Sequence, residues 1–227
     1  TATDACSSIT ISYSDAVTTD CGTTYHVVRT WLAVDACGNS SACDQLITIQ
    51  DTTRPVITCP ADITLNCPAD TSTTNTGVAT ATDACSSVTI SYSDAVTADC
   101  GTTYHVVRTW LAVDACGNSN SCDQLIIVQD TTSPTITVPA MNDTVQCDGS
   151  GNATAYMSWI DNNGGAMASD GCGSFIWDTT LVSRTPGCGK TRIDRVLFIA
   201  RDACGNADTT EGLFVIIDTI APVMPAA

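Results

Sequence analysis

The sequence predicts an all-β protein made of tandem β-sandwiches. Three observations support this prediction: a long internal repeat, short strand-like segments between turns, and an unusual choice of acidic residues. Glu211 is the only glutamate among the 24 acidic residues of the 227-residue chain. Aspartate is disfavoured inside helices and favoured in turns, so this composition argues against a helical protein.

An internal repeat organises the chain. Residues 3–51 recur almost unchanged at residues 82–130, and the motif Asp-Ala-Cys-Gly-Asn returns again at 202–206. Similar segments beginning at Asp51, Asp130 and Asp218 punctuate the copies. They define repeat 1 (1–51, a partial copy without its N-terminal strands), repeat 2 (52–130), the divergent repeat 3 (131–218), and 219–227 as the start of a next repeat or a linker.

Short strands between turns are expected within each repeat. The clearest pair in repeat 2 is joined at residues 114–118, where Gly117 can take the positive φ that a hairpin turn with a bulge requires. No stretch longer than a turn has helical periodicity. Roughly seven short strands in about 80–90 residues predict an immunoglobulin-like β-sandwich. The expected strands are 55–59, 61–67, 77–82, 87–92, 103–113 and 121–129.

The motifs of repeat 2 resemble a known family. The string Asp51-Thr-Thr-Arg-Pro-Val-Ile-Thr-Cys-Pro-Ala-Asp-Ile-Thr precedes Ala81-Thr-Asp-Ala-Cys and Val113-Asp-Ala-Cys-Gly-Asn. These motifs resemble the hyalin-repeat (HYR) immunoglobulin-like domains, above all those of large bacterial surface adhesins. The resemblance covers nearly the whole chain and weakens at 138, 210 and 150–169. It implies an extracellular, disulfide-bearing stalk or filament module without enzymatic activity.

The net charge of −16 limits the classes of partner that the chain can bind. Phosphate binding needs Lys and Arg, so a nucleic-acid partner is not expected. Apolar runs such as Leu125 to Val128 are too short to span a bilayer, so membrane insertion is not expected either.

The 14 cysteines predict a disulfide framework and an extracellular or cell-surface location. Repeat 3 lacks counterparts of Cys59 and Cys122, and a pair lost together is best explained as a bonded pair. Three pairings remain for the other four cysteines of repeat 2. Chain proximity favours Cys67–Cys85 and Cys100–Cys116, and by equivalence Cys147–Cys172, Cys188–Cys204 and Cys21–Cys37.

Cys6 and Cys43 are left without partners in this scheme. Their expected partners belong to an opening segment that repeat 1 lacks, so we expect the sequence to be an excerpt of a longer polypeptide. A zinc site is disfavoured because no C-x2-C spacing occurs and only two histidines are present.

Aspartates recur in register at linkers and turns. No cofactor is required, but Ca²⁺ takes six to eight oxygen ligands, which clustered aspartates and loop carbonyls can supply. In tandem bacterial immunoglobulin-like adhesins, aspartates of similar motifs bind interdomain calcium. The alternative is that these residues only cap turns. The candidate ligands are Asp51, Asp114, Asp130, Asp202 and Asp218.

No catalytic constellation is found, so an enzyme is not expected. The motifs G-x-S-x-G and HExxH and the EF-hand loop are absent from the sequence. Trp159 and Trp177 could form a platform for surface glycans, but core packing is the better interpretation. A carbohydrate-binding module or an accessory region of a larger secreted enzyme are therefore the alternative functions.

The hairpin of repeat 2 carries aliphatic residues on both faces. The family resemblance places Trp110, Ala112, Ile126 and Val128 inward. A contiguous apolar patch on the other face would mark an interface with other copies of the repeat or chain, as in a fibre. Burial by the loop around 92–99 is the alternative. The expected interface residues are Leu111, Val113, Leu125 and Ile127.

Two kinds of glycosylation signal occur. Asn39, Asn142 and Asn152 begin N-x-S/T sequons. Asp-Thr strings resemble an O-glycosylation motif of the bacterial group whose adhesins these repeats resemble; the candidates include Thr52, Thr131 and Thr144. Together the sequence predicts a structural repeat region of an extracellular filament or adhesin stalk.

Overall fold

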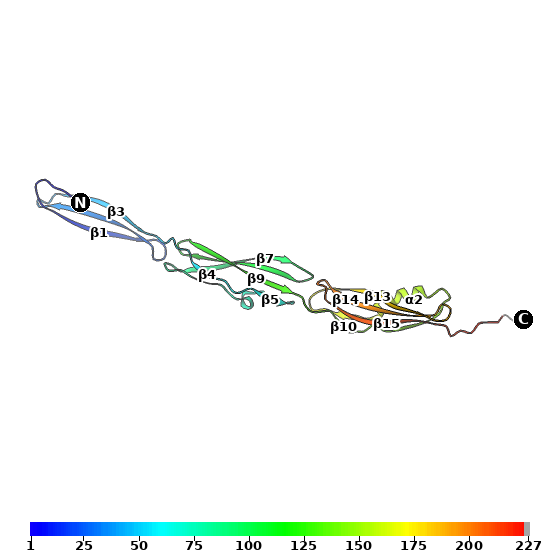
Figure 1. Cartoon of the computed structure of the whole chain (residues 1–227). Helices are drawn as coiled ribbons and strands as arrows, with labels where there is room; N and C mark the ends of the chain where they lie inside the picture. Colours follow the sequence, from blue (N-terminus) through cyan, green and yellow to red (C-terminus); the bar gives the residue numbers. More distant parts are fainter. Residues whose placement is uncertain (225–227) are drawn as a thin grey trace. The chain divides into compact units, whose positions relative to one another are not determined.

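The computed structural model describes residues 1–224, and the rest of the segment 219–227 lies outside the described residues. The chain divides into two compact units. Unit 1 holds repeat 1 and much of repeat 2, and unit 2 holds the remainder of repeat 2 with repeat 3 (Figure 1). Unit 1 comprises Thr1–Ile63, Thr71–Ala95 and Val106–Ile126; unit 2 comprises Thr64–Asp70, Val96–His105 and Ile127–Ala227.

Repeat 1 forms one antiparallel sheet. Its order is β1 (Ile9–Thr19), β2 (Tyr25–Asp35) and β3 (Ser40–Ile49). No second sheet of the described residues pairs with it, so Trp31 on β2 is only half-buried, whereas its counterpart Trp110 in repeat 2 is 2% exposed.

Repeat 2 is a two-layered sandwich, as the sequence predicts. One layer has the strand order β5-β9-β8-β7 and the other pairs β4 with β6. Alternating residues of β8 and β9, including Trp110 and Ile126, are buried between them. The elements are β4 (Val56–Thr58), β5 (Ile63–Asn66), the short helix α1 (Thr73–Thr76), β6 (Thr80–Thr82), β7 (Val88–Ala98), β8 (Tyr104–Asp114) and β9 (Ser119–Gln129).

Two polar side chains complete the core of repeat 2. Arg108 of β8 is 2% exposed and donates to the Asp94 carboxylate at 2.7 and 2.8 Å, to the Thr76 hydroxyl at 2.8 Å and to the Thr71 carbonyl at 3.0 Å. Gln124 of β9 donates to the Thr76 carbonyl at 2.7 Å. A buried charge is tolerated when such partners replace water, so these residues tie the α1 segment to the sheet.

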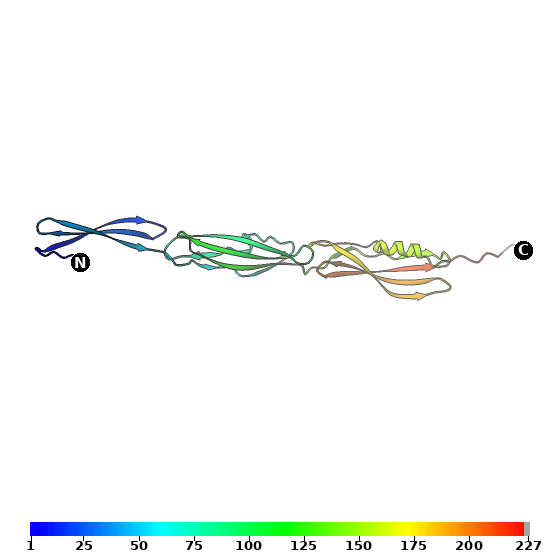
Figure 2. The same cartoon turned by 90° about the horizontal axis from the view of Figure 1, so that it is seen from above.

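Repeat 3 has the same layers and an added helix. Its main sheet has the order β11-β15-β14-β13, with β11 parallel to β15, and β10 pairs with β12. The absence of helical periodicity predicted no helix, but the insertion forms α2 beside the strands (Figure 2). The elements are β10 (Thr135–Val138), β11 (Asp143–Gln146), α2 (Ala153–Asp161), η1 (Asn163–Gly165), β12 (Met167–Ser169), β13 (Phe175–Pro186), β14 (Arg192–Asp202) and β15 (Ala207–Ile217).

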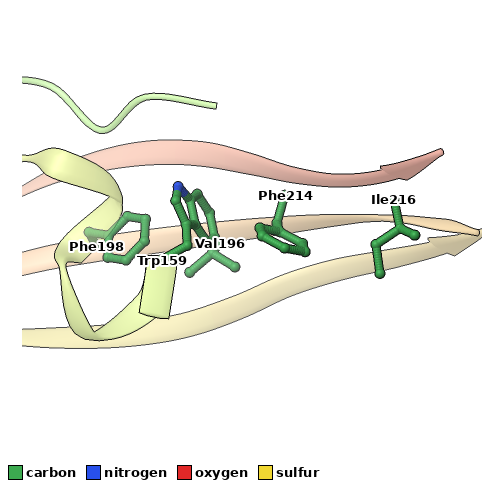
Figure 3. Packing of buried hydrophobic residues seen from close by; sticks show 5 residues of the cluster. All are labelled: Trp159, Val196, Phe198, Phe214 and Ile216. Atoms are coloured by element: carbon green, nitrogen blue, oxygen red, sulfur yellow. The ribbon is translucent and has the colours of Figure 1, made fainter. Parts of the chain in front are cut away.

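Two core positions that are polar in repeat 2 are apolar in repeat 3. Val196 stands at the position of Arg108 and Gly212 at that of Gln124, when the shared Asp-Ala-Cys-Gly-Asn motifs are aligned. Trp159 of α2 fills the space that this exchange leaves: a Cβ on Gly212 would lie 2.8 Å from the indole. Figure 3 shows the indole among side chains from the strands. The buried cluster comprises Trp159, Val196, Phe198, Phe214 and Ile216.

Candidate functional site: the disulfide-linked repeat junctions

Disulfide bonds join consecutive repeats. Cys21 of repeat 1 is bonded to Cys116 of repeat 2, with Cα atoms 5.2 Å apart. Cys100 of repeat 2 is bonded to Cys204 of repeat 3, with Cα atoms 5.1 Å apart. The two bonds occupy equivalent positions of the repeat. We call their surroundings junction 1, which lies within unit 1, and junction 2, which lies within unit 2.

A third bond closes repeat 2 internally. Cys59, directly after β4, is bonded to Cys122 of β9, with Cα atoms 6.0 Å apart. This is the pair assigned from its joint loss in repeat 3. It links the two layers of the sandwich, which adds stability to a domain of this small size.

The bonds predicted from chain proximity across the long strands are wrong. Cys100 and Cys116 flank β8, whose 11 residues separate the two ends by about 35 Å at about 3.3 Å per residue. Each cysteine therefore meets a neighbouring repeat instead of the other end of its own strand. The same correction applies to Cys21–Cys37, across β2, and to Cys188–Cys204, across β14.

The other two expected bonds, Cys67–Cys85 and Cys147–Cys172, are also absent from the structure, which describes all the cysteines. The unbonded cysteines are Cys6, Cys37, Cys43, Cys67, Cys85, Cys147, Cys172 and Cys188.

An aspartate turn holds the bonded cysteine on one side of each junction. In junction 1, Asp114 accepts hydrogen bonds from the backbone N–H of Cys116 and of Asn118, both at 2.8 Å. The Asn118 amide also donates to the Asp51 carbonyl at 3.2 Å, which fixes the linker against the turn. Junction 2 repeats the arrangement with Asp202, Cys204, Asn206 and Asp130.

These turns depend on ionised carboxylates. Burial favours a raised pKa for Asp114 and Asp202, but the hydrogen bonds that each carboxylate accepts, above all from Asn118 and Asn206, together outweigh it and lower the pKa of both. A lowered pKa in the folded state means stability that is present above the unfolded pKa, about 4, and lost as the pH falls through the folded pKa.

Acidic clusters lie beside both turns. In junction 2, carboxylate oxygens of Asp130, Asp170 and Asp202 lie within 4.8 Å of one another. The Asp170 Oδ2 atom is buried without a hydrogen-bond partner, so this set offers oxygen ligands of the kind that Ca²⁺ takes. In junction 1 the corresponding cluster is Asp51, Asp83 and Cys85, with Asp51 Oδ2 also unpartnered.

Two expected calcium ligands lie outside these clusters. Asp114 is 5% exposed, and its oxygens serve the turn. Asp218 accepts from the Gln146 amide at 3.3 Å and from the Ile220 N–H at 3.1 Å. Sequence reasoning missed Asp83 and Asp170 as cluster members, although both precede a cysteine in register.

Two unbonded cysteines also meet in junction 2. The Cys67 Sγ atom lies 3.9 Å from the Cys172 carbonyl oxygen and 3.4 Å from the Thr102 hydroxyl. Burial, together with a hydrogen bond between the Cys172 and Cys67 thiols, raises the pKa of the Cys172 thiol to about 12. Both residues belong to unit 2.

The tryptophans of repeat 3 do not form an exposed platform. Trp159 is 8% exposed, and its indole N–H donates to the Met141 carbonyl at 3.0 Å. Trp177 is half-buried and packs against the same core cluster. Core packing, the better interpretation from sequence, describes both.

The outward face of the β8–β9 hairpin is partly open. Leu111 is 39% exposed, and its neighbours Val113, Leu125 and Ile127 are half-buried. The alternative cover, a loop around 92–99, is not what the structure has, because β7 continues to Ala98. The inward residues Trp110, Ala112, Ile126 and Val128 are buried, as the resemblance implied.

The glycosylation candidates differ in accessibility. Asn152 is 7% exposed and its side-chain nitrogen donates to the Gln146 carbonyl at 2.8 Å, so its amide is occupied and largely inaccessible in the folded chain. Asn39 and Asn142 are exposed. The candidate threonines Thr52, Thr131 and Thr144 are exposed as well.

No family model matches the sequence, and no curated protein matches it, so the likeness to hyalin repeats rests on its motifs. Solved structures similar to the chain include cadherin ectodomains. The protocadherin gammaB7 EC3-6 cis-dimer is 12% identical, with 91% of this chain and 68% of that chain covered and a TM-score of 0.34. The human desmocollin-1 ectodomain is 12% identical, with 92% and 56% covered and a TM-score of 0.33. Drosophila N-cadherin EC1-4 is 10% identical, with 95% and 68% covered and a TM-score of 0.32.

Sequence identities and TM-scores this low show no shared function. Among residues 1–224, no helix is long and apolar enough to cross a membrane.

Proposed function

We propose that the chain is a non-catalytic structural region of an extracellular filament or surface adhesin stalk, in which repeats 2 and 3 are successive immunoglobulin-like domains and repeat 1 is a partial one. The observation that carries this proposal is the pair of cross-repeat bonds, Cys21–Cys116 and Cys100–Cys204. A bond inside a domain leaves the linker to transmit tension. A bond between domains gives tension a second covalent path that bypasses the folded residues between the two cysteines, so a stalk under tension keeps those residues folded.

The location follows from the same bonds. Disulfides persist in oxidising environments and are rare in the cytosol. A chain whose domains are joined through disulfides would lose those joints in a reducing compartment, so an extracellular or cell-surface site fits its construction.

Calcium binding at junction 2 is part of the proposal. The three carboxylates of Asp130, Asp170 and Asp202 would repel one another without a cation, and bound Ca²⁺ would hold the linker to repeat 3. We expect saturating calcium to raise the melting temperature of the oxidised protein by several degrees and chelation to reverse the rise. Differential scanning calorimetry measures both.

A matched pair of variants locates the ion. Asp170→Asn should abolish the calcium-dependent rise, whereas Asp161→Asn, at an exposed aspartate of α2, should retain it. An unchanged melting temperature after chelation of the wild-type protein would remove calcium from the proposal.

Lateral contact with other copies is the filament part of the proposal. Leu111 and Leu125 lie on the outward face of β8 and β9, and a partly exposed aliphatic patch is typical of interfaces. We expect Leu111→Lys with Leu125→Lys to thin or dissolve fibres seen by electron microscopy and to leave the circular dichroism spectrum unchanged. Val78→Lys, at a site 62% exposed, is the control. Equal fibres from both variants would contradict the lateral contact and leave the stalk function standing.

A further inference from the structure

We propose that Cys67 and Cys172 form a second disulfide bond across junction 2, beside Cys100–Cys204. The Cys67 Sγ atom is directed at Cys172, 3.9 Å from its carbonyl oxygen. The Thr102 hydroxyl, 3.4 Å from Cys67 Sγ, donates a hydrogen bond to that same carbonyl. The pair therefore shares one small polar contact at the interface of repeat 2 with repeat 3.

Junction 1 shows that this arrangement belongs to the repeat and is not an accident of one place. There Thr23, the counterpart of Thr102, donates to the Cys85 carbonyl through its hydroxyl at 2.9 Å and its backbone N–H at 3.0 Å. Cys85 is the counterpart of Cys172. The chain has no cysteine at the position that would correspond to Cys67 in junction 1, so only junction 2 contains both members of the pair.

Further unbonded cysteines stand at the same positions of the repeat. In repeat 3, Cys147 and Cys188 stand at the positions of Cys67 and Cys100, which face the following repeat. In repeat 1, Cys6 and Cys37 stand at the positions of Cys85 and Cys116, which face the preceding repeat. The two pairs are thus the complementary halves of a junction with two bridges.

The oxidation is an ordinary thiol–disulfide exchange with a protein dithiol catalyst of the oxidising compartment. The Cys67 thiolate attacks the catalyst disulfide, forms a mixed disulfide and releases one catalyst thiolate. Cys172 loses its thiol proton to solvent and attacks the Cys67 sulfur, which releases the second catalyst thiolate. Two protein thiols are oxidised, one catalyst disulfide is reduced, and no other reactant is consumed.

The test is disulfide mapping of the full oxidised chain. Free thiols are alkylated in denaturant without reductant, and the peptides are identified by mass spectrometry. We expect a cross-linked peptide containing Cys67 and Cys172, and alkylation of the other six cysteines that the structure leaves unbonded. Alkylation of Cys67 or Cys172, or a bond from either to another cysteine such as Cys85, would overturn the proposal.

Two variants sharpen this result. Cys172→Ser should release Cys67 for alkylation, whereas Cys85→Ser should leave Cys67 protected. Protection of Cys67 that persists in Cys172→Ser, or disappears in Cys85→Ser, would contradict the assignment. The map of the wild-type chain decides the matter even if a variant folds poorly, and it does not depend on the proposed stalk function.

Discussion

Arg108→Met is expected to destabilise repeat 2 by about 2–4 kcal/mol, because it removes the positive partner from a buried ion pair. The Arg108 side chain is 3% exposed, while that of Asp94 is 30% exposed. Its loss leaves the Asp94 carboxylate, the Thr76 hydroxyl and the Thr71 carbonyl without their donor. Solvent can reach Asp94, so the cost stays below that of a fully buried lone charge.

Repeat 1 supplies the matched control. Arg29 stands at the same repeat position and pairs with Asp15 at 2.7 Å, but its side chain is 26% exposed and that of Asp15 is 30% exposed. Arg29→Met should cost less than about 1 kcal/mol, as for exposed ion pairs. Hydrogen exchange by mass spectrometry under mild denaturant, read separately for β8 and β2, measures the two effects. Equal losses in both variants would contradict the role assigned to burial.

Trp159→Ala is expected to destabilise repeat 3 by about 3–5 kcal/mol, the usual cost of emptying a large aromatic site in a core. The indole packs edge-on to Phe198, with ring centroids 5.1 Å apart, and covers Gly212, which has no side chain to fill the vacated space. The same change also leaves the Met141 carbonyl without its donor.

Hydrogen exchange of the β14 and β15 amides, followed in increasing denaturant on the full oxidised chain, measures this loss of stability. Trp177→Ala, at a half-buried ring on the margin of the cluster, is the control and should cost clearly less. A smaller effect at Trp159 than at Trp177 would show that α2 is a surface addition and not part of the core.

The sequence predicted β8 and β9 well because the repeat and the alternation of apolar residues are local signals, whereas β7 runs to Ala98, beyond the expected end at 92. Trp110 and Ile126 are buried where the resemblance places them. Helix α2 was missed because the segment at the same place in repeat 2, between β5 and β6, forms only the four-residue helix α1. The role of α2 is seen only in the folded structure. Trp159 packs over Gly212 and takes the place that the polar contacts of Arg108 and Gln124 have in repeat 2.

The junction bonds were missed for a geometric reason. Chain proximity is a poor guide when a strand lies between two cysteines, since β8 carries Cys100 and Cys116 to opposite ends of a sandwich. The length of β8, which the sequence did predict, contains the signal that would exclude this pair. The partner in the next repeat could not be found from strand lengths alone, because it depends on how the hairpin turn and the linker meet.

Pulling a single oxidised chain from its two ends tests the cross-repeat linkage most directly. With Cys21–Cys116 and Cys100–Cys204 intact, tension bypasses most of the chain, and the unfolded protein should extend over roughly 60 residues, about 200 Å. Reduction should release the full 227 residues, roughly 750 Å. Bonds confined within repeats would leave roughly 100 residues or more to extend, and an oxidised length above about 350 Å would contradict the account.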